Sequence, residues 1–352
     1  MEQSLIIFAV GLGFLFAFIN GFHDGGNVIA ASVLSRSLSP HKALGLACLA
    51  EFLGPLILGT AVATTIGSEV MNLVYLDPAQ RMVATLFLLS GLLSAITWNL
   101  MTWWVGIPSS STHALIGGLL GGSVAACGFG IVNWLSLITL VAVPVLIAPA
   151  AGLLIGYLAM MLAALYLRGA PTRANHVFKR MQFLSVLLLG AGHGTNSAQK
   201  AMAVITMVLL ASGSLQEFEV PLWVVLGCAF SLVLGVSVGG WKIVKIRESR
   251  VFKIEAVHSF VAQAASGGVM IGASLLGSPI GTMNTVKSAI LGVGAGSRGK
   301  RPARMVVKDL IAAWVMTTPA CAFLAAAIYW TAAGALGQGM GIFEGIMRAL
   351  GQ

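Results

Sequence analysis

The stretch MEQSLIIFAVGLGFLFAFIN, residues 1–20, indicates the fold class, because an apolar run of this length can cross a membrane as one helix. Comparable apolar stretches recur along the whole chain of 352 residues. Hydrophobic residues make up 58% of the sequence and charged residues only 9%, which leaves too few polar side chains to cover a soluble protein. The first stretch lacks a basic leading segment and a small-residue cleavage site, so we expect a retained helix and not a signal peptide. The sequence therefore predicts an all-α polytopic membrane protein.

Three basic stretches predict which ends of the helices face the cytoplasm. Fourteen of the 20 Lys and Arg residues lie within Arg168–Arg180, Lys242–Lys253 and Arg298–Lys308. Such clustering in short loops follows the positive-inside rule, so the net charge of +9 marks cytoplasmic loops and not a nucleic-acid-binding surface. With these loops inside, both chain termini are expected on the outer side. The intervening loops carry the acidic residues Glu69, Asp77, Glu217 and Glu219.

Hydropathy divides the chain into separate membrane segments, and we expect about 10–12 transmembrane helices in total. The longest segment, residues 134–167, exceeds one straight span and should break or kink at Pro144 and Pro149. The ten segments recognised from the sequence are residues 4–22, 43–66, 82–105, 108–126, 134–167, 182–211, 221–241, 256–276, 279–295 and 309–333.

One segment occurs twice at a fixed offset, because Gly106–Gly121 matches Gly277–Gly292. In the expected topology the two copies run in opposite directions, which makes them parts of an inverted repeat. Inverted repeats with Gly/Pro-broken segments are typical of secondary transporters that alternate access around a midplane site. We expect residues 1–167 to form the first repeat, residues 168–180 a cytoplasmic basic linker, and residues 181–352 the second repeat.

A polar cluster, Asn20–Asn27, follows the first apolar stretch. Its carboxylate, Asp24, lies at a depth where a charged group is expensive unless it serves a function. The flanking glycines predict unwound backbone, whose carbonyl oxygens could join Asp24 and Asn27 in binding Na⁺ or accepting a proton. The alternative is a loop at the membrane edge, in which His23 and Asp24 are simply solvated.

Two hydroxyl-rich clusters each precede a helix of small residues. The first, Gly106–His113, places four hydroxyl groups at a helix N-terminus, where free N–H groups and the helix dipole favour an anion. The second, Ser278–Lys287, has fewer hydroxyls and an added lysine. These clusters predict an oxyanion cradle, and an ordinary helix cap is the alternative. No nucleophile elbow or orienting acid accompanies the Ser/His pair, so we do not expect an enzyme.

A further polar cluster, Gly192–Lys200, opens the second half of the chain. Lys200 stands in an apolar context, where an ammonium group needs a carboxylate, an anion or water as a partner. The alternative is that its side chain reaches toward a membrane interface.

These clusters resemble the motifs of the inorganic phosphate transporter (PiT) family. Gly21–Asn27 is similar to the first-half signature of bacterial low-affinity phosphate permeases, and Gly194–Lys200 is similar to the second-half signature. Gly106–His113 resembles the family's hairpin, and Gly277–Asn284 is a worn copy of it. Glu51 stands in the second predicted helix, where relatives often carry an acid. The resemblance implies two inverted halves, phosphate held between hairpin hydroxyls, symport with Na⁺, H⁺ or as a metal–phosphate complex, and a homodimer.

The resemblance also implies the partners of the protein, its location and the roles of individual residues. No cofactor is expected besides the coupling ion, and the expected partners are inorganic phosphate and membrane lipid, without nucleic acid. The expected location is a bacterial cytoplasmic (inner) membrane. The substrate-binding residues would be Ser110, Ser111, Thr112, Thr282, Asn284, Gln199 and Lys200. Cation or proton coupling would involve Asp24, Asn27, Glu51, Asn196 and Ser197, with Asp24 and Asn27 as the ligands if the ion is Na⁺.

Departures from the family pattern lie mostly in the second half. Ser197 replaces an Asp, Gln263 stands where several relatives carry Glu, and Met283-Asn284 replaces a hydroxyl and a histidine. Lys287 is an added cation, unless it faces the cytoplasm beside the neighbouring basic stretch. An anion site that gains a lysine needs less coupling cation to balance it. We therefore predict altered coupling, with the first-half acids Asp24 and Glu51 as the remaining cation or proton sites.

Three functions are consistent with this sequence. The first is transport of inorganic phosphate, and the second is transport of sulfate or another oxyanion by the same fold, because hydroxyl and N–H donors bind either tetrahedral anion. The third is a non-transporting oxyanion sensor, which would bind its ligand without flux. Protonated phosphate requires an acceptor for its P–OH group, and Asp24 or Glu51 would provide one, which favours phosphate.

Overall fold

The computed structural model describes residues 2–71, 81–107, 109–168, 173–246, 254–297 and 303–337. Within these ranges every element is helical, apart from one isolated bridge between Met71 and Val132. The helices are α1 (Glu2–Leu34), α2 (Pro40–Leu58), α3 (Ala61–Thr64), the π-helix η1 (Thr65–Val70), α4 (Arg81–Val105), α5 (Ser111–Cys127), the 3₁₀-helix η4 (Phe129–Ile131), α6 (Trp134–Ser136), the π-helix η5 (Leu137–Ala142), α7 (Val143–Tyr166), α8 (Arg173–Ala211), α9 (Leu222–Ile246), α10 (Ala256–Leu275), α11 (Thr282–Gly296) and α12 (Ala303–Ala335).

The all-α membrane architecture predicted from the sequence is confirmed. In the described part of the chain, six helical stretches are long and apolar enough to cross a membrane. The 39-residue helix α8 is not among them, because the polar cluster in its middle lowers its hydropathy. The six stretches are Gln3–Leu34, Pro40–Leu58, Arg81–Val105, Trp134–Tyr166, Leu222–Gly240 and Val315–Ala335.

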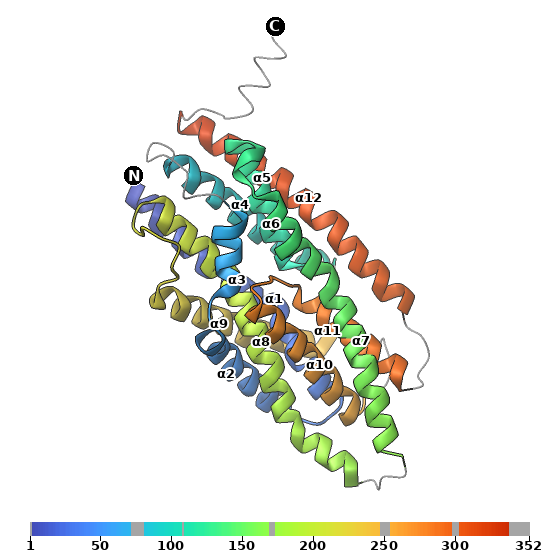
Figure 1. Ribbon diagram of the computed structural model, residues 1–352. Helices are drawn as coiled ribbons and strands as arrows, with labels where there is room; N and C mark the ends of the chain where they lie inside the picture. Colours follow the sequence, from blue (N-terminus) through green and yellow to red (C-terminus); the bar gives the residue numbers. More distant parts are fainter. Residues whose placement is uncertain are drawn as a thin grey trace.

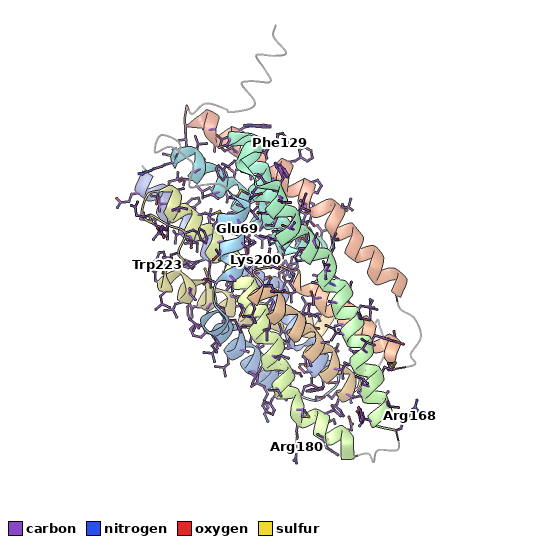
Figure 2. The ribbon with its side chains drawn as sticks, viewed as in Figure 1. Glu69, Phe129, Arg168, Arg180, Lys200 and Trp223 are labelled. Carbon is purple, nitrogen blue, oxygen red and sulfur yellow. The ribbon has the colours of Figure 1, made fainter. Side chains whose placement is uncertain are left out.

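The two ends of the helix bundle differ in charge. The start of α1 and the end of α12 lie at the same end, which we call the terminal end (Figure 1). Arg168 and Arg180 lie at the opposite end, which we call the basic end (Figure 2). Asp77, much of the basic stretches at 242–253 and 298–308, and the chain after residue 337 fall outside the described residues or side chains.

Helices α4 and α5 form an antiparallel hairpin that opens toward the terminal end (Figure 1). Gly91 packs against Gly118, and Phe87 packs against Gly122, which fixes the antiparallel register. The sequence predicted two crossings here, at 82–105 and 108–126; Arg81–Val105 is long and apolar enough to cross a membrane, and α5 is shorter, at 17 residues. A hairpin leaves its two ends on the same side, as two crossings do, so hydropathy alone does not distinguish them.

Helices α10 and α11 form the second pair of this kind, at the basic end of the bundle (Figure 1). At 15 residues, α11 is shorter than the roughly 20 residues that a membrane-spanning helix needs. Each hairpin packs against a long helix from the other half of the chain, because α12 lies along α5 and α7 lies along α11. The packing is reciprocal elsewhere too, since α1 lies along α9 and α2 lies along α8.

Helix α1 continues through the polar cluster at residues 20–27, where the sequence predicted unwound backbone. The reason lies in close helix packing, because a Cβ on Gly21 would lie 2.0 Å from the carbonyl oxygen of Leu232. Gly25 likewise meets the side chain of Val236 on α9. The glycines therefore let two helices approach each other, and the carbonyl groups of this segment remain within the helix.

Helix α8 likewise runs unbroken through its polar cluster, and it begins at Arg173 where the sequence placed its start at residue 182. The basic linker expected at 168–180 is therefore partly helical. The expected segment at 134–167 divides into α6, η5 and α7, and the π-helix η5 ends two residues before Pro144. Pro149 lies inside α7.

Candidate substrate and coupling site

The tips of the two hairpins meet in the middle of the bundle. The hydroxyl of Thr112, in the first turn of α5, donates a hydrogen bond to the carbonyl of Ile280 at 3.0 Å. Ser110, at the start of the same helix, lies against Gly281 of the other tip. Each tip thus presents a helix N-terminus with free N–H groups toward the same place.

Lys200 on α8 reaches this junction, where its Nζ donates to the hydroxyl of Thr112 at 2.9 Å. The lysine is only 1% exposed and lies near the centre of the bundle (Figure 2). Among the described side chains, no carboxylate lies within ion-pair distance of it, although Asp24 attracts it through space. A buried ammonium without a paired carboxylate favours an anion beside it.

Asp24 on α1 faces the first hairpin from the other side. Its Oδ1 lies 3.0 Å from Nδ1 of His23, and its Oδ2 accepts a hydrogen bond from the Ser111 hydroxyl at 3.3 Å. Asn27 is buried one turn further along α1. Because the backbone here is helical, the ligand set for Na⁺ expected from the sequence loses its carbonyl oxygens and retains only side-chain groups.

Glu51 on α2 pairs with His193 on α8, and both side chains are 0% exposed. The carboxylate Oε1 lies 3.1 Å from the ring Nδ1, although the two groups lack the alignment of a hydrogen bond. Gly194 allows this approach, because a Cβ there would collide with the backbone of Glu51. Sequence reasoning named Glu51 and gave His193 no role. His193 could have been identified as a histidine inside an apolar stretch, directly before the motif Gly194–Lys200.

Asn196 holds the tip of the second hairpin. Its Nδ2 donates to the carbonyl of Ser278 at 3.0 Å, and its Oδ1 accepts from the N–H of Ile280 at 3.2 Å. Ser197 follows it on α8, at the position where the family carries an acid. The buried hydroxyls of Ser197 and Thr282 have no hydrogen-bond partner, so both are available to a ligand.

Gln199 was expected to bind substrate, but its amide oxygen and amide nitrogen both bind backbone groups at the break between α2 and α3. Its Oε1 accepts from the N–H groups of Val62 at 2.6 Å and Ala63 at 3.1 Å. Its Nε2 donates to the carbonyl of Gly59. Gln199 therefore binds protein and not the space between the hairpins.

Gln263 explains one departure from the family pattern. Its Nε2 donates to the carbonyl of Val28 at 2.7 Å, and its Oε1 accepts from the hydroxyl of Ser185 at 2.9 Å and from Nε2 of Gln182. An ionised Glu would have no proton to donate to Val28, so an amide suits this network better than a carboxylate.

The remaining predicted residues lie on or beside α11 and α5. Asn284 is buried next to Gly281, and Lys287 is half-buried further along α11. His113 lies 2.8 Å from the Ser110 hydroxyl through its Nδ1. The structure thus brings together the hairpin hydroxyls, Lys200 and Asp24. It places Glu51 on the neighbouring α2–α8 contact.

The chain is similar to known proteins over most of its length. Residues 20–171 and 167–325 match the phosphate transporter family. A Rhizobium meliloti protein named as a probable low-affinity inorganic phosphate transporter is 36% identical over 330 residues, covering 93% of this chain and 96% of the relative. A Bacillus subtilis protein of the same name is 36% identical over 328 residues, covering 93% of this chain and 96% of the relative.

A solved structure titled "The sodium-dependent phosphate transporter" has the same fold, with a TM-score of 0.82 and 24% sequence identity. The match covers 93% of this chain and 98% of that one. The apolar helices and the bacterial relatives identify a multi-pass protein of the inner membrane. The chain belongs to the phosphate transporter family.

Proposed function

We propose that this protein takes up inorganic phosphate across the cytoplasmic membrane by proton-coupled secondary transport. The observation that carries the proposal is Lys200, a buried ammonium that touches the hairpin hydroxyl of Thr112 without a carboxylate partner among the described residues. An oxyanion between the hairpin tips supplies the missing negative charge, and the lysine offsets the cost of removing that anion from water.

The substrate-binding groups come from both hairpins and from α8. Ser110, Ser111 and Thr112 supply hydroxyls from the first tip, and a bound anion would have to replace Asp24 and Ile280 as the acceptors of the Ser111 and Thr112 hydroxyls. The second tip supplies the hydroxyl of Thr282, which has no partner. Asn284 adds an amide, while Gln199 is left out because backbone groups engage both its amide oxygen and its amide nitrogen. Lys200 completes the set as the only charged donor within it.

Coupling is assigned to two carboxylate–imidazole pairs, His23–Asp24 and Glu51–His193. A buried pair of this kind holds a proton between two basic groups, so each pair is suited to gain or lose one proton during a transport cycle. Asp24 also meets the hairpin through Ser111, which links its protonation to the substrate site.

Sodium coupling is less well supported by this geometry. Asp24, Asn27, Asn196 and Ser197 provide side-chain oxygens, but the amide of Asn196 is already engaged and the helical carbonyls are occupied. A divalent metal–phosphate complex, if used, would enter as the substrate itself.

Alternating access between two inverted halves completes the proposal. The reciprocal packing of α1 on α9 and α2 on α8, with hairpins at opposite ends, supports the inverted repeat. A homodimer and contact with membrane lipid are further expectations from the family resemblance.

The test is uptake of radiolabelled phosphate by proteoliposomes that contain the purified protein. We expect accumulation that follows an imposed proton gradient, persists without Na⁺ and resists excess sulfate. Accumulation that requires a Na⁺ gradient would overturn proton coupling, and competition by sulfate would indicate a general oxyanion permease. Binding of phosphate without any flux would identify a sensor.

A further inference from the structure

Helix α2 ends at Leu58, and the chain breaks at Gly59 and Thr60 before it continues as α3. Gly59 adopts a φ of 80°, which favours glycine, and the chain resumes as α3 and η1 through Val70. A break of this kind leaves N–H and C=O groups without helical partners, and such groups destabilise the fold unless other groups bind them. Thr60, the residue before α3, makes no side-chain cap.

Gln199 of α8 supplies the missing partners. Its amide oxygen accepts from the first free N–H groups of α3, at Val62 and Ala63, and its amide nitrogen donates to the carbonyl of Gly59. One side chain therefore satisfies both sides of the break, so the position of the segment 59–70 depends on α8. The contacts with Val62 and Ala63 are buried, and the contact with Gly59 is partly buried.

The neighbouring residues of the same helical turn hold the two hairpins. Asn196 binds the tip of the second hairpin through Ser278 and Ile280, and Lys200 binds the tip of the first through Thr112. Residues 196–200 thus contact three interruptions of the membrane helices at once. A shift of α8 at this point displaces all three.

The segment 59–70 is also packed directly against the second hairpin. A Cβ on Gly277 would lie 2.6 Å from Oγ1 of Thr65 and 3.1 Å from the carbonyl of Ala61. On its other side, Gly67 lies against the ring of Phe218, in the loop between α8 and α9. The segment therefore lies between the hairpin tip and that loop and has little room to move independently.

We propose that Gln199 is a positioning residue that couples the segment 59–70 to the hairpin tips, so that this segment acts as a gate on the terminal side of the site. The inference rests on the proposed function only in using inorganic phosphate as the ligand. Gln199 acts through the backbone of the break and does not touch the anion.

The test combines hydrogen–deuterium exchange with transport kinetics on the full chain in lipid nanodiscs and proteoliposomes. In Gln199→Met, which keeps the side-chain length without polar atoms, we expect faster exchange in peptides covering 59–71. We expect the maximal phosphate uptake rate to fall by at least about fivefold while phosphate affinity changes by less than about threefold, because the variant disturbs a movement and not a ligand contact. In the unmodified protein, saturating phosphate should slow exchange in the same peptides.

Two further variants keep the test decisive. Gln199→Glu retains the acceptor for Val62 and Ala63 but loses the donor to Gly59, so it should fall between the unmodified protein and Gln199→Met. Gln182→Met removes another fully buried glutamine from α8 and should leave exchange at 59–71 unchanged.

Unchanged exchange at 59–71 in Gln199→Met would overturn the proposal. So would a large loss of phosphate affinity without any change in exchange, because that result would return Gln199 to the substrate site. Failure of the unmodified protein to accumulate phosphate would instead count against the proposed function, since the exchange measured without ligand does not depend on transport.

Discussion

Lys200 and Lys287 are the two candidates for a fixed positive charge that balances the substrate anion. Lys200 is buried at the junction of both hairpins and touches Thr112, whereas Lys287 is half-buried further along α11. The sequence suggested Lys287 because it departs from the family pattern. The structure favours Lys200, because contact with the hairpin hydroxyl depends on how α8 packs and is not visible in the sequence.

Replacement of each lysine by methionine distinguishes these roles. We expect Lys200→Met to reduce phosphate uptake by at least about tenfold, because a charge-assisted hydrogen bond contributes about 1.5–3 kcal/mol. Lys287→Met should reduce uptake by less than about threefold on the same scale. Initial uptake rates in proteoliposomes, normalised to the amount of folded protein, provide the measurement. Equal losses in the two variants would show that Lys200 has no special role.

A carboxylate restored at position 197 tests the link between charge and coupling. Ser197 is fully buried on α8, three residues before Lys200, and its hydroxyl has no partner. We expect Ser197→Asp to make uptake depend on Na⁺, because an added buried negative charge favours a cation beside it. Uptake with and without Na⁺ at one pH provides the measurement, and Ser197→Asn is the matched control. Identical Na⁺ dependence in the two variants would contradict this view.

Gln263 provides a prediction about stability. In Gln263→Glu the carbonyl of Val28 loses its donor, so we expect the free energy of unfolding to fall by about 1–3 kcal/mol. The midpoint of thermal unfolding in detergent shows this as a lower temperature. Gln263→Met also removes the acceptor used by Ser185, and it should lower the midpoint further. A midpoint for Gln263→Glu equal to that of the unmodified protein would show that the network contributes no stability.

At the scale of elements, glycines determine how closely the helices approach. A Cβ on Gly235 of α9 would lie 1.9 Å from the carbonyl oxygen of Phe18 on α1, whereas a Cβ on Gly45 of α2 meets nothing within 4 Å. Both glycines lie inside apolar helices, and only the packing of the helices shows that Gly235 has a close neighbour and Gly45 has none.

These two glycines therefore respond differently to alanine. We expect Gly235→Ala to destabilise the protein by about 1–3 kcal/mol, because the helices must separate to admit the methyl group. Gly45→Ala should be neutral or stabilising by up to about 1 kcal/mol, because alanine is the better helix former. Thermal unfolding of both variants in the same detergent gives the comparison. A lower unfolding temperature for Gly45→Ala would contradict the open space that surrounds Gly45 in the structure.

Much of the fold could be predicted from the sequence, and the errors have specific physical causes. Apolar length located the segments, but it does not reveal that residues 82–105 and 108–126 pair as a hairpin whose tip lies in the bundle, because a hairpin and two separate crossings have the same hydropathy. The glycines at positions 21 and 25 were read as helix breakers, although they face Leu232 and Val236 on α9. Such partners lie more than 200 positions away, so local sequence could not reveal them.

The candidate site divides in the same way. Polar residues in apolar stretches identified Asp24, Lys200 and the hairpin hydroxyls, because burial of such groups requires a reason wherever the chain folds. Two features could not be predicted: the pairing of Glu51 with His193, and the hydrogen bonds of Gln199 to the backbone at the break between α2 and α3. Both depend on the parallel packing of α2 on α8, which only the assembled bundle shows.

At the scale of the whole molecule, the distribution of charge fixes an orientation. The basic end carries the exposed Arg168, and the exposed Glu217 lies in the loop that follows the other end of α8. From the positive-inside rule we expect the basic end to face the cytoplasm and the start of α1 and the end of α12 to face outward.

Thiol labelling in intact cells tests this orientation. With the four native cysteines replaced, we expect Glu217→Cys to react with a membrane-impermeant reagent added outside, because its loop faces the periplasmic side. Arg168→Cys should react only after the membrane is permeabilised. The reverse pattern would place the basic end outside and would invert the proposed direction of the gate.

Among the described residues, the hydrogen bonds by which Gln199 of α8 spans the break between α2 and α3 have no counterpart between α1 and α9. If Gly21 corresponds to Gly194, then Gly26 stands where Gln199 would be, and α9 runs unbroken where α2 is interrupted. The outward-open and inward-open conformations of the transporter are then not related by symmetry, and their free energies need not be equal. Michaelis constants measured from outside and inside should differ. Without a gradient, detailed balance still requires equal ratios of maximal rate to Michaelis constant, so tighter binding at one face is matched by slower turnover from that face.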